Sequence, residues 1–427
     1  MLHVENARIK ELALHGNIGL EKEGHRVTQN GRMARTPHPF SPLEPHITRD
    51  FSENQMEINT DPFPNAHEAV ASLGEITRQV QQTLATLPER EYLWPFSNPP
   101  FLQDEKDIPI AIFEGPQAGK TSYRRYLANN YGKYKMTFSG IHLNFSFSDE
   151  LLEEDFKLSG GNDFQTYKNL LYLKVAEKAA EYGWILTFLT AASPLMDASF
   201  FSKGLKGRDA FVGMGSVRCG ELGYWNHFTP ILDYTSATAY ASSIQRYVDN
   251  GFIVAPTELY YPIRLKPRGV NSLEGIVRNG INHIELRMID LNPLTREGLD
   301  VRDARFAQLF LVFLASTPQT YLGTKSQVRA IQNFKNAARY DARLINILLP
   351  NGDSCAVTEA GMTIIEQMKK FYLDADDEVQ EVLRFQASKF LRPENRYPFQ
   401  VFQRFRDVFT EKGLERAKEL QEEYLSA

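Results

Sequence analysis

Alternation of polar and apolar residues in three strand-like segments constrains the fold of this chain more than any other feature. The polar pairs, each spaced two positions apart, are Glu21 with Glu23, His142 with Asn144, and Glu285 with Arg287. Side chains two positions apart lie on the same face of a strand, and the intervening apolar residues lie on the other. We therefore expect a sheet with one buried apolar face and one face that carries ionisable groups.

The wider pattern predicts an α+β fold. Residues 17–23, 46–60, 108–113, 136–147 and 282–290 are strand-like and bounded by Gly, Pro, Asn or Asp. Helical spacing covers residues 66–87, 163–182, 300–316, 325–348, 358–373, 378–391 and 411–424. Irregular connections between the strands favour a mainly antiparallel sheet. Because no long linker interrupts the chain, we predict a single domain over residues 1–427, with a sheet-bearing core (1–293) and a helical C-terminal layer (294–427).

Composition excludes several classes of protein. Of 427 residues, 42% are hydrophobic and 24% charged, as in ordinary globular proteins, and the net charge of −5 gives no basic excess for nucleic acid. The longest apolar run, residues 309–315, is too short to cross a bilayer, and the N-terminus does not resemble a signal peptide. The two cysteines, Cys219 and Cys355, fit a reducing cytoplasm. We expect small-molecule partners, with no nucleic acid and no membrane.

A further strand-like segment adds Asp50, Glu53 and Glu57 to the carboxylates. If these strands are neighbours, the polar face gathers several like charges, which ionise together only when cations neutralise them. Oxygen ligands with an occasional His or Asn suit Mg²⁺ or Mn²⁺, which commonly bridge the phosphates of a nucleotide. The alternative is that the pairs form ordinary solvated strand faces, which antiparallel sheets often have.

Six segments in order resemble the bacterial-type glutamate-cysteine ligases, including the N-terminal ligase module of bifunctional glutathione synthases. They are residues 19–27 (GLEKEGHRV), 46–57 (HITRDFSENQME), 94–97 (WPFS), 139–146 (SGIHLNFS), 218–224 (RCGELGY) and 284–293 (IELRMIDLNP). The resemblance implies a funnel-like sheet similar to the glutamine synthetase catalytic domain, with ATP at one end and amino acids at the other. It also implies ATP-dependent ligation of the glutamate γ-carboxylate to the amino group of cysteine through γ-glutamyl phosphate, giving γ-glutamylcysteine, ADP and phosphate, the first step of glutathione biosynthesis.

The resemblance also assigns roles to individual residues. It implies one metal ion at Glu21, Asp50 and Glu285, a second at Glu21, Glu285 and His142, and a third at Glu23 and Glu57. Asn144 and Arg124 are expected beside the nucleotide phosphates, Arg287 at the transferred phosphoryl group, and Arg218 at an amino-acid carboxylate. The expected wall of the acceptor pocket is Phe51, Tyr123, Leu127, Tyr224 and Tyr260, although packing in the core would equally explain these side chains.

The sequence departs from the family where the acceptor amino acid should bind. Met136, Thr137 and Phe138 replace a segment that usually carries a glutamine, and Leu143 stands where a tyrosine is common. Met136 and Phe138 are therefore candidate acceptor-pocket residues. A larger, more apolar pocket would favour another amine, because a lost polar partner shifts selectivity strongly. A γ-glutamyl ligase with a different acceptor is therefore the alternative function.

Two other interpretations are disfavoured. Residues 114–121 (EGPQAGKT) end like a phosphate-binding P-loop, but three residues instead of four separate Gly115 from Gly119. A catalytically silent binding protein on the same scaffold should lack metal ligands, yet every expected position is filled. The residues after Asn292 are too few for a second ATP-dependent ligase domain, so we expect no bifunctional fusion.

Overall fold

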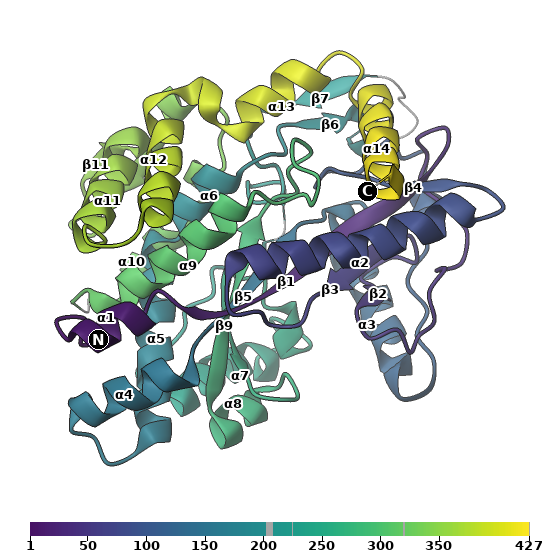
Figure 1. Ribbon diagram of the computed structural model, residues 1–427. Helices are drawn as coiled ribbons and strands as arrows, with labels where there is room; N and C mark the ends of the chain where they lie inside the picture. Colours follow the sequence, from purple (N-terminus) through teal and green to yellow (C-terminus); the bar gives the residue numbers. More distant parts are fainter. Residues whose placement is uncertain (202–207, 224, 319–320, 427) are drawn as a thin grey trace.

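Seven antiparallel strands form the central sheet, in the order β2-β3-β1-β5-β9-β8, with β4 paired to one end of β1 (Figure 1). The computed structural model describes all residues except 202–207, 224, 319–320 and 427. The strands are β1 (Gly16–Thr28), β2 (Ile47–Arg49), β3 (Gln55–Asn59), β4 (Glu91–Leu93), β5 (Ile141–Phe147), β8 (Ile263–Pro267) and β9 (Ile281–Ile289). The prediction of an α+β fold with an antiparallel sheet is confirmed.

The strand register brings the predicted polar pairs together. Glu21 on β1 lies opposite His142 on β5, and Glu23 lies opposite Glu57 on β3. Asn144 on β5 lies opposite Glu285 on β9. Between Ile141 and Leu143 the β5–β9 register shifts, so that β9 carries one extra residue beside His142. Such a bulge bends a strand and strengthens its twist, and bulges of this kind are common next to active sites.

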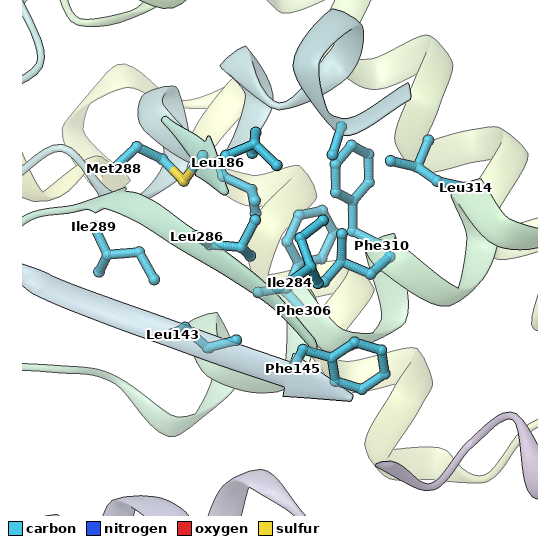
Figure 2. Close-up of a cluster of buried hydrophobic side chains, with 14 of the residues drawn as sticks. Leu143, Phe145, Leu186, Ile284, Leu286, Met288, Ile289, Phe306, Phe310 and Leu314 are labelled. Carbon is cyan, nitrogen blue, oxygen red and sulfur yellow. The ribbon is translucent and has the colours of Figure 1, made fainter. Parts of the chain in front are cut away.

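The opposite face of the sheet is apolar and packs against helices (Figure 2). Leu143, Ile284 and Leu286 belong to the main core cluster, together with Phe306 and Phe310 of α9 (Val301–Ser316). Helices α2 (Ala66–Thr86), α5 (Phe164–Tyr182) and α6 (Trp184–Thr190) also pack on the strands. The C-terminal part is helical and covers the sheet as predicted, and its helix α9 lies within the main core.

The remaining elements surround this core. The helices are α1 (Ala7–Leu12), α3 (Ala118–Tyr131), α4 (Asp149–Ser159), α7 (Ala237–Asp249), α8 (Leu273–Asn279), α10 (Thr324–Ala337), α11 (Val357–Phe371), α12 (Asp377–Leu391), α13 (Tyr397–Phe405) and α14 (Phe409–Ser426). Two small hairpins pair β6 (Leu195–Asp197) with β7 (Asp209–Phe211) and β10 (Asn346–Leu348) with β11 (Ser354–Ala356). Among the described helices, none has both the length and the apolar character needed to span a bilayer.

Several predicted elements differ from the structure. Residues 46–60 form the hairpin β2–β3, because the polar residues Asp50, Ser52 and Asn54 make a turn between the strands. Glu53 in this turn pairs with Arg49 and stays outside the cluster of site carboxylates. Residues 108–113 form no strand, and within them Ile110 makes one isolated bridge to Ser52. The predicted strand 136–147 begins only at residue 141, and the predicted helix 325–348 ends at residue 337, before β10.

Candidate active site

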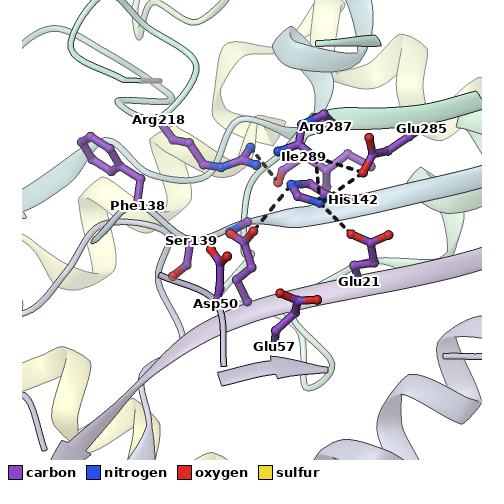
Figure 3. Close-up of polar contacts among 12 residues, drawn as sticks. Glu21, Asp50, Glu57, Phe138, Ser139, His142, Arg218, Glu285, Arg287 and Ile289 are labelled. Carbon is purple, nitrogen blue, oxygen red and sulfur yellow. Dashed lines mark hydrogen bonds and ion pairs between the residues drawn. The ribbon is translucent and has the colours of Figure 1, made fainter. Parts of the chain in front are cut away.

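The polar face of the sheet lines a cavity of about 280 Å³. Five carboxylates, here called the carboxylate cluster, open into it: Glu21, Glu23, Asp50, Glu57 and Glu285. Figure 3 shows several of them gathered around the imidazole of His142. Arg124, Arg218 and Arg287 also line the cavity. Of the six residues that alternation predicts on one face, all except Asn144 thus come together in one concave site.

Glu21, His142 and Glu285 form the tightest group of potential metal ligands. One ligand atom from each lies within 4.8 Å of the others. His142 Nδ1 is 2.9 Å from Glu21 Oε2 and 3.7 Å from Glu285 Oε1. The other oxygen of Glu21 accepts a hydrogen bond of 2.8 Å from Asn144 Nδ2. This donor set of two carboxylates and one imidazole fits a divalent cation.

Glu285 is almost fully buried at the centre of the site, and its cationic neighbours favour the ionised form. Burial alone would raise the pKa of Glu285, but Arg287 and Lys266 hold that pKa well below its usual range. Arg287 Nη1 lies 2.9 Å from Glu285 Oε1, and Lys266 Nζ lies 3.3 Å from Glu285 Oε2. In turn Glu285 raises the pKa of Arg287 against the effect of burial. A fixed negative charge therefore lies between two cationic side chains.

Two other carboxylates of the cluster, Glu23 and Glu57, have too little positive charge nearby to offset their burial. Burial and the Asp50 charge raise the pKa of Glu23 well above its usual range, and the same causes raise the pKa of Glu57 to about 7. Glu23 Oε2 accepts a hydrogen bond of 2.9 Å from the Gly140 amide, and its Oε1 lies 3.6 Å from His142 Nε2. Carboxylates that repel one another in this way are favourable ligands for a cation.

Asp50 and Arg124 meet at the edge of the cavity nearest α3. Arg124 Nε donates a hydrogen bond to the Asp50 carbonyl, and Arg124 Nη2 lies 3.7 Å from Asp50 Oδ1. The β2–β3 turn therefore carries a carboxylate into the site, and α3 carries a guanidinium.

Arg218 lies against the loop that precedes β5. Its Nη1 donates a hydrogen bond of 3.4 Å to the Ile289 carbonyl. A Cβ atom on Gly140 would lie 2.3 Å from Arg218 Cζ, so only glycine at position 140 allows this packing. Arg218 lines the cavity, and its Nε has no hydrogen-bond partner among the described residues.

The expected acceptor wall is only partly assembled. Phe51, Tyr123, Leu127, Met136 and Tyr260 line the cavity, and Tyr224 is outside the described residues. Phe138 lies behind the wall, where it packs with Met196 and Val217. Leu143 is on the apolar face opposite Leu20 and Leu286, because its position falls between the polar positions 142 and 144. The inference about the acceptor pocket from Leu143 is therefore wrong.

Asn144, which donates a hydrogen bond to Glu21, lines a second depression of about 400 Å³. Its lining includes Asn144, Lys168, Arg268 and His283. The two cationic side chains and the imidazole outnumber the one carboxylate in the lining, Asp149, so the depression can receive an anionic group.

The cavity also contains residues that the sequence analysis missed. They include Lys266, Cys219, Trp225 and Thr257. Lys266 belongs to β8, where Ile263 and Leu265 alternate with Arg264 and Lys266, so the same pattern could have found it. Burial raises the pKa of the Cys219 thiol to about 11, so this cysteine is protonated near neutral pH.

Comparisons with known proteins identify relatives. The sequence profile of the family "Glutamate-cysteine ligase" matches residues 2–252 and 246–337. The chain is 35% identical over 436 residues to the glutathione biosynthesis bifunctional protein GshAB of Listeria monocytogenes, covering 98% of this chain and 56% of that protein. It therefore spans little more than half the length of this curated relative.

Two crystal structures share the fold. A bifunctional glutathione synthetase from Pasteurella multocida superposes with a TM-score of 0.86 at 27% identity, covering 100% of this chain and 55% of that one. A glutamate–cysteine ligase from Francisella tularensis in complex with AMP also gives a TM-score of 0.86, at 20% identity, covering 97% of this chain and 89% of that one. With the profile match over most of its length, the chain belongs to the glutamate-cysteine ligase family.

Proposed function

We propose that this chain is an ATP-dependent glutamate-cysteine ligase. It joins the γ-carboxylate of glutamate to the amino group of cysteine and releases γ-glutamylcysteine, ADP and phosphate. The observation that carries the proposal is the carboxylate cluster, which lies around His142 on one sheet face of a member of this family. A cytoplasmic location is part of the proposal, because the substrate thiol and the two unpaired cysteines suit a reducing compartment.

Metal ions are part of the proposed site. Glu21, His142 and Glu285 would hold one Mg²⁺ or Mn²⁺ ion, Asp50 would join Glu21 and Glu285 at another, and Glu23 and Glu57 would hold a third. When bound, these ions would neutralise the negative charge that develops on the phosphoryl group during its transfer. The buried, mutually repelling carboxylates described above support this assignment.

The cationic side chains have separate tasks in the proposed reaction. Arg287, held by Glu285, is assigned to the transferred phosphoryl group. Asn144 and Arg124 are assigned to the nucleotide phosphates, and the depression next to Asn144 has room for part of the nucleotide. Arg218 is assigned to an amino-acid carboxylate, which a planar guanidinium can bind through two hydrogen bonds.

The reaction proceeds in two displacements. An oxygen of the glutamate γ-carboxylate attacks the γ-phosphorus of ATP, the bond to the β-phosphate oxygen breaks, and ADP leaves. The amine nitrogen of the acceptor then attacks the acyl carbon, and phosphate leaves as the amide forms. Aligned substrates and offset charge are the main requirements, so no protein nucleophile is needed.

A different amine acceptor is the second candidate. Met136, one of the departures from the family pattern, lines the cavity beside Leu127 and Phe51. An apolar wall at this place would favour an acceptor with a larger apolar side chain. A screen of amines with glutamate and ATP fixed distinguishes the two candidates, because a clear preference for cysteine excludes the second.

Replacement of Glu285 tests the catalytic assignment. Phosphate release from ATP, Mg²⁺, glutamate and cysteine should be acceptor-dependent in the wild type. Turnover should fall at least about 100-fold in Glu285→Gln, because the substitution removes a charge that holds the cations and Arg287. The matched control is Glu75→Gln on the exposed side of α2, and circular dichroism checks that both variants fold. Unchanged turnover in a folded Glu285→Gln variant would refute the metal assignment.

A further inference from the structure

Glu258 is a buried carboxylate outside the carboxylate cluster. It ends the 3-10 helix η5 (Pro256–Glu258) and is fully shielded from solvent. Its Oε1 accepts hydrogen bonds from Tyr131 Oη at 2.8 Å, Tyr126 Oη at 3.1 Å and Asn130 Nδ2 at 3.4 Å. Its Oε2 accepts one of 2.7 Å from the Val254 amide. All four donors are neutral, so hydrogen bonds alone offset the cost of burying this carboxylate.

Three of these donors belong to α3, which otherwise packs on the body through one small apolar cluster around Leu127. Only Thr121 and Leu127 of α3 are buried, and the elements it packs against most are the adjoining turns η2 (Gly115–Gln117) and η3 (Lys135–Thr137). Figure 1 shows α3 projecting from the body beside β2. Its N-terminal half is held by Thr121, which accepts a hydrogen bond of 2.7 Å from the Phe113 amide, and by Arg124 over the Phe113 ring. Glu258 supplies the buried hydrogen bonds of the C-terminal half, beside the apolar contacts of Leu127 and Tyr131.

The same hydrogen-bond network reaches two further segments of the cavity wall. Asn226 Nδ2 donates to Tyr131 Oη at 3.2 Å and to the Glu258 carbonyl at 2.9 Å. Asn226 Oδ1 accepts a hydrogen bond of 2.8 Å from the Tyr260 amide. We call the set of Glu258, Tyr126, Asn130, Tyr131 and Asn226 the Glu258 network.

The three segments that the network joins all line the cavity. Tyr123 and Leu127 come from α3, Trp225 precedes Asn226, and Thr257 and Tyr260 flank Glu258. The Tyr131 ring also packs edge-on against the Tyr260 ring, with centroids 5.3 Å apart. Glu258 itself does not line the cavity, so it acts on a substrate only through its partners.

We propose that Glu258 is a positioning residue that fixes α3 against Tyr260 and so sets the shape of the acceptor side of the pocket. This inference rests on the proposed ligase function. The groups assigned to ATP and glutamate have other supports, because Glu21, Glu285 and Arg287 lie on the hydrogen-bonded strands β1 and β9. Arg124 is on α3, but it belongs to the N-terminal half of that helix and is held by the Asp50 carbonyl and the Phe113 ring. Loss of the network should therefore weaken acceptor binding and acceptor selectivity, and it should leave the other two substrates nearly unaffected.

The test compares Glu258→Gln and Tyr131→Phe with a matched control, Tyr167→Phe. Tyr167 on α5 also donates to a fully buried carboxylate, Asp155 on α4, at 2.5 Å, but neither residue lines the cavity. In both network variants the KM for the acceptor should rise about tenfold, while the KM values for glutamate and ATP stay within about twofold. Discrimination between cysteine and serine should fall. The control should change none of these values.

Hydrogen exchange at the amides of residues 126–131 gives a readout that does not depend on activity. Exchange there should be faster in Tyr131→Phe than in Tyr167→Phe. If Glu258→Gln fails to fold, Tyr131→Phe decides the outcome. Unchanged acceptor KM, or an equal rise for all three substrates, would overturn the positioning role. If the wild type turns over no acceptor, the proposed function fails instead, and unchanged exchange in α3 would then separately overturn the inference.

Discussion

Glu57 couples the stability of the protein to pH and to metal. Burial and the Asp50 charge raise its pKa from 4.5 to about 7, so the folded state binds this proton more tightly than the unfolded chain does. The resulting contribution to stability is fully present below pH 4.5 and is lost as the pH rises through about 7. Because a bound cation offsets the repulsion, the stabilisation by Mg²⁺ should increase over the same interval.

Thermal or urea unfolding at pH 5 to 8, with EDTA or with Mg²⁺, measures this coupling. The metal-free protein should lose on the order of 1 kcal/mol across the interval, a value that allows for the partial exposure of Glu57. In Glu57→Gln the free energy of unfolding should change less with pH than in the wild type, and Glu75→Gln should behave like the wild type. If Mg²⁺ raised the free energy of unfolding by the same amount at every pH, the prediction would be wrong.

The alternation of polar and apolar residues along the strands made many of the site residues predictable from the sequence. It placed Glu21, His142 and Glu285 on one face, and the register confirms that their strands are neighbours. Alternation also explains the error at Leu143, since the residue between two polar positions must face the core. It carries no information about Phe138, which precedes the strand and whose place depends on contacts with Met196 and Val217.

Helix α14 packs closely against the core at Gly413, which contacts the ring of Trp94. Gly413 faces the buried ring of Trp94, and a Cβ atom there would lie 2.3 Å from Trp94 Cη2. The indole is held in place by a hydrogen bond of 2.8 Å from its Nε1 to the Asn98 carbonyl, so it cannot move aside easily. Gly413→Ala should therefore destabilise the protein by about 1–3 kcal/mol.

Thermal unfolding checks this prediction against Gly119→Ala, which adds the same methyl group to α3 where no atom lies within 4 Å. That control should be neutral or slightly stabilising, because alanine has the higher helix propensity. Turnover by folded Gly413→Ala should match the wild type, since α14 packs on α2 and β4 and contributes nothing to the cavity lining. If Gly413→Ala were as stable as the wild type, the contact between residue 413 and Trp94 would have to be looser than described.

Element prediction succeeded where periodicity is long and failed where turn chemistry decides. The patterns at 66–87 and 163–182 match α2 and α5 closely, because each helix offers several turns of regular spacing. The hairpin at 46–60 was missed because its turn contains no Gly or Pro, so only the polar run at residues 52–55 marks the break between the strands. Helix α10 ends at residue 337, and Asp341 caps the next 3-10 turn by accepting a hydrogen bond from the Arg343 amide, a signal that apolar spacing does not carry.

At the scale of the whole molecule, the residues after 293 belong to the same core as the sheet. All residues of α9 from Asp303 to Ala315 are buried. The Leu2 amide donates a hydrogen bond of 3.0 Å to the Ala315 carbonyl, which joins the start of the chain to this helix. Asp303 in turn lies 2.7 Å from Lys389 Nζ and accepts a hydrogen bond of 2.7 Å from Tyr397 Oη. Contacts of this kind join segments distant in sequence, so local patterns could not reveal them.

The division at residue 293 therefore should not separate two folding units. The full chain should unfold in one cooperative calorimetric transition. A fragment of residues 1–293 should lack cooperative unfolding and near-ultraviolet circular dichroism, because removing α9 uncovers Leu143, Ile284 and Leu286 on the apolar face of the sheet. A fragment that unfolds cooperatively on its own would contradict this view and would assign the C-terminal helices to a separate layer. In that case the buried pair Asp303–Lys389 would stabilise only that layer. In the full chain, Asp303→Asn would then lower the transition of the C-terminal helices and leave that of residues 1–293 unchanged.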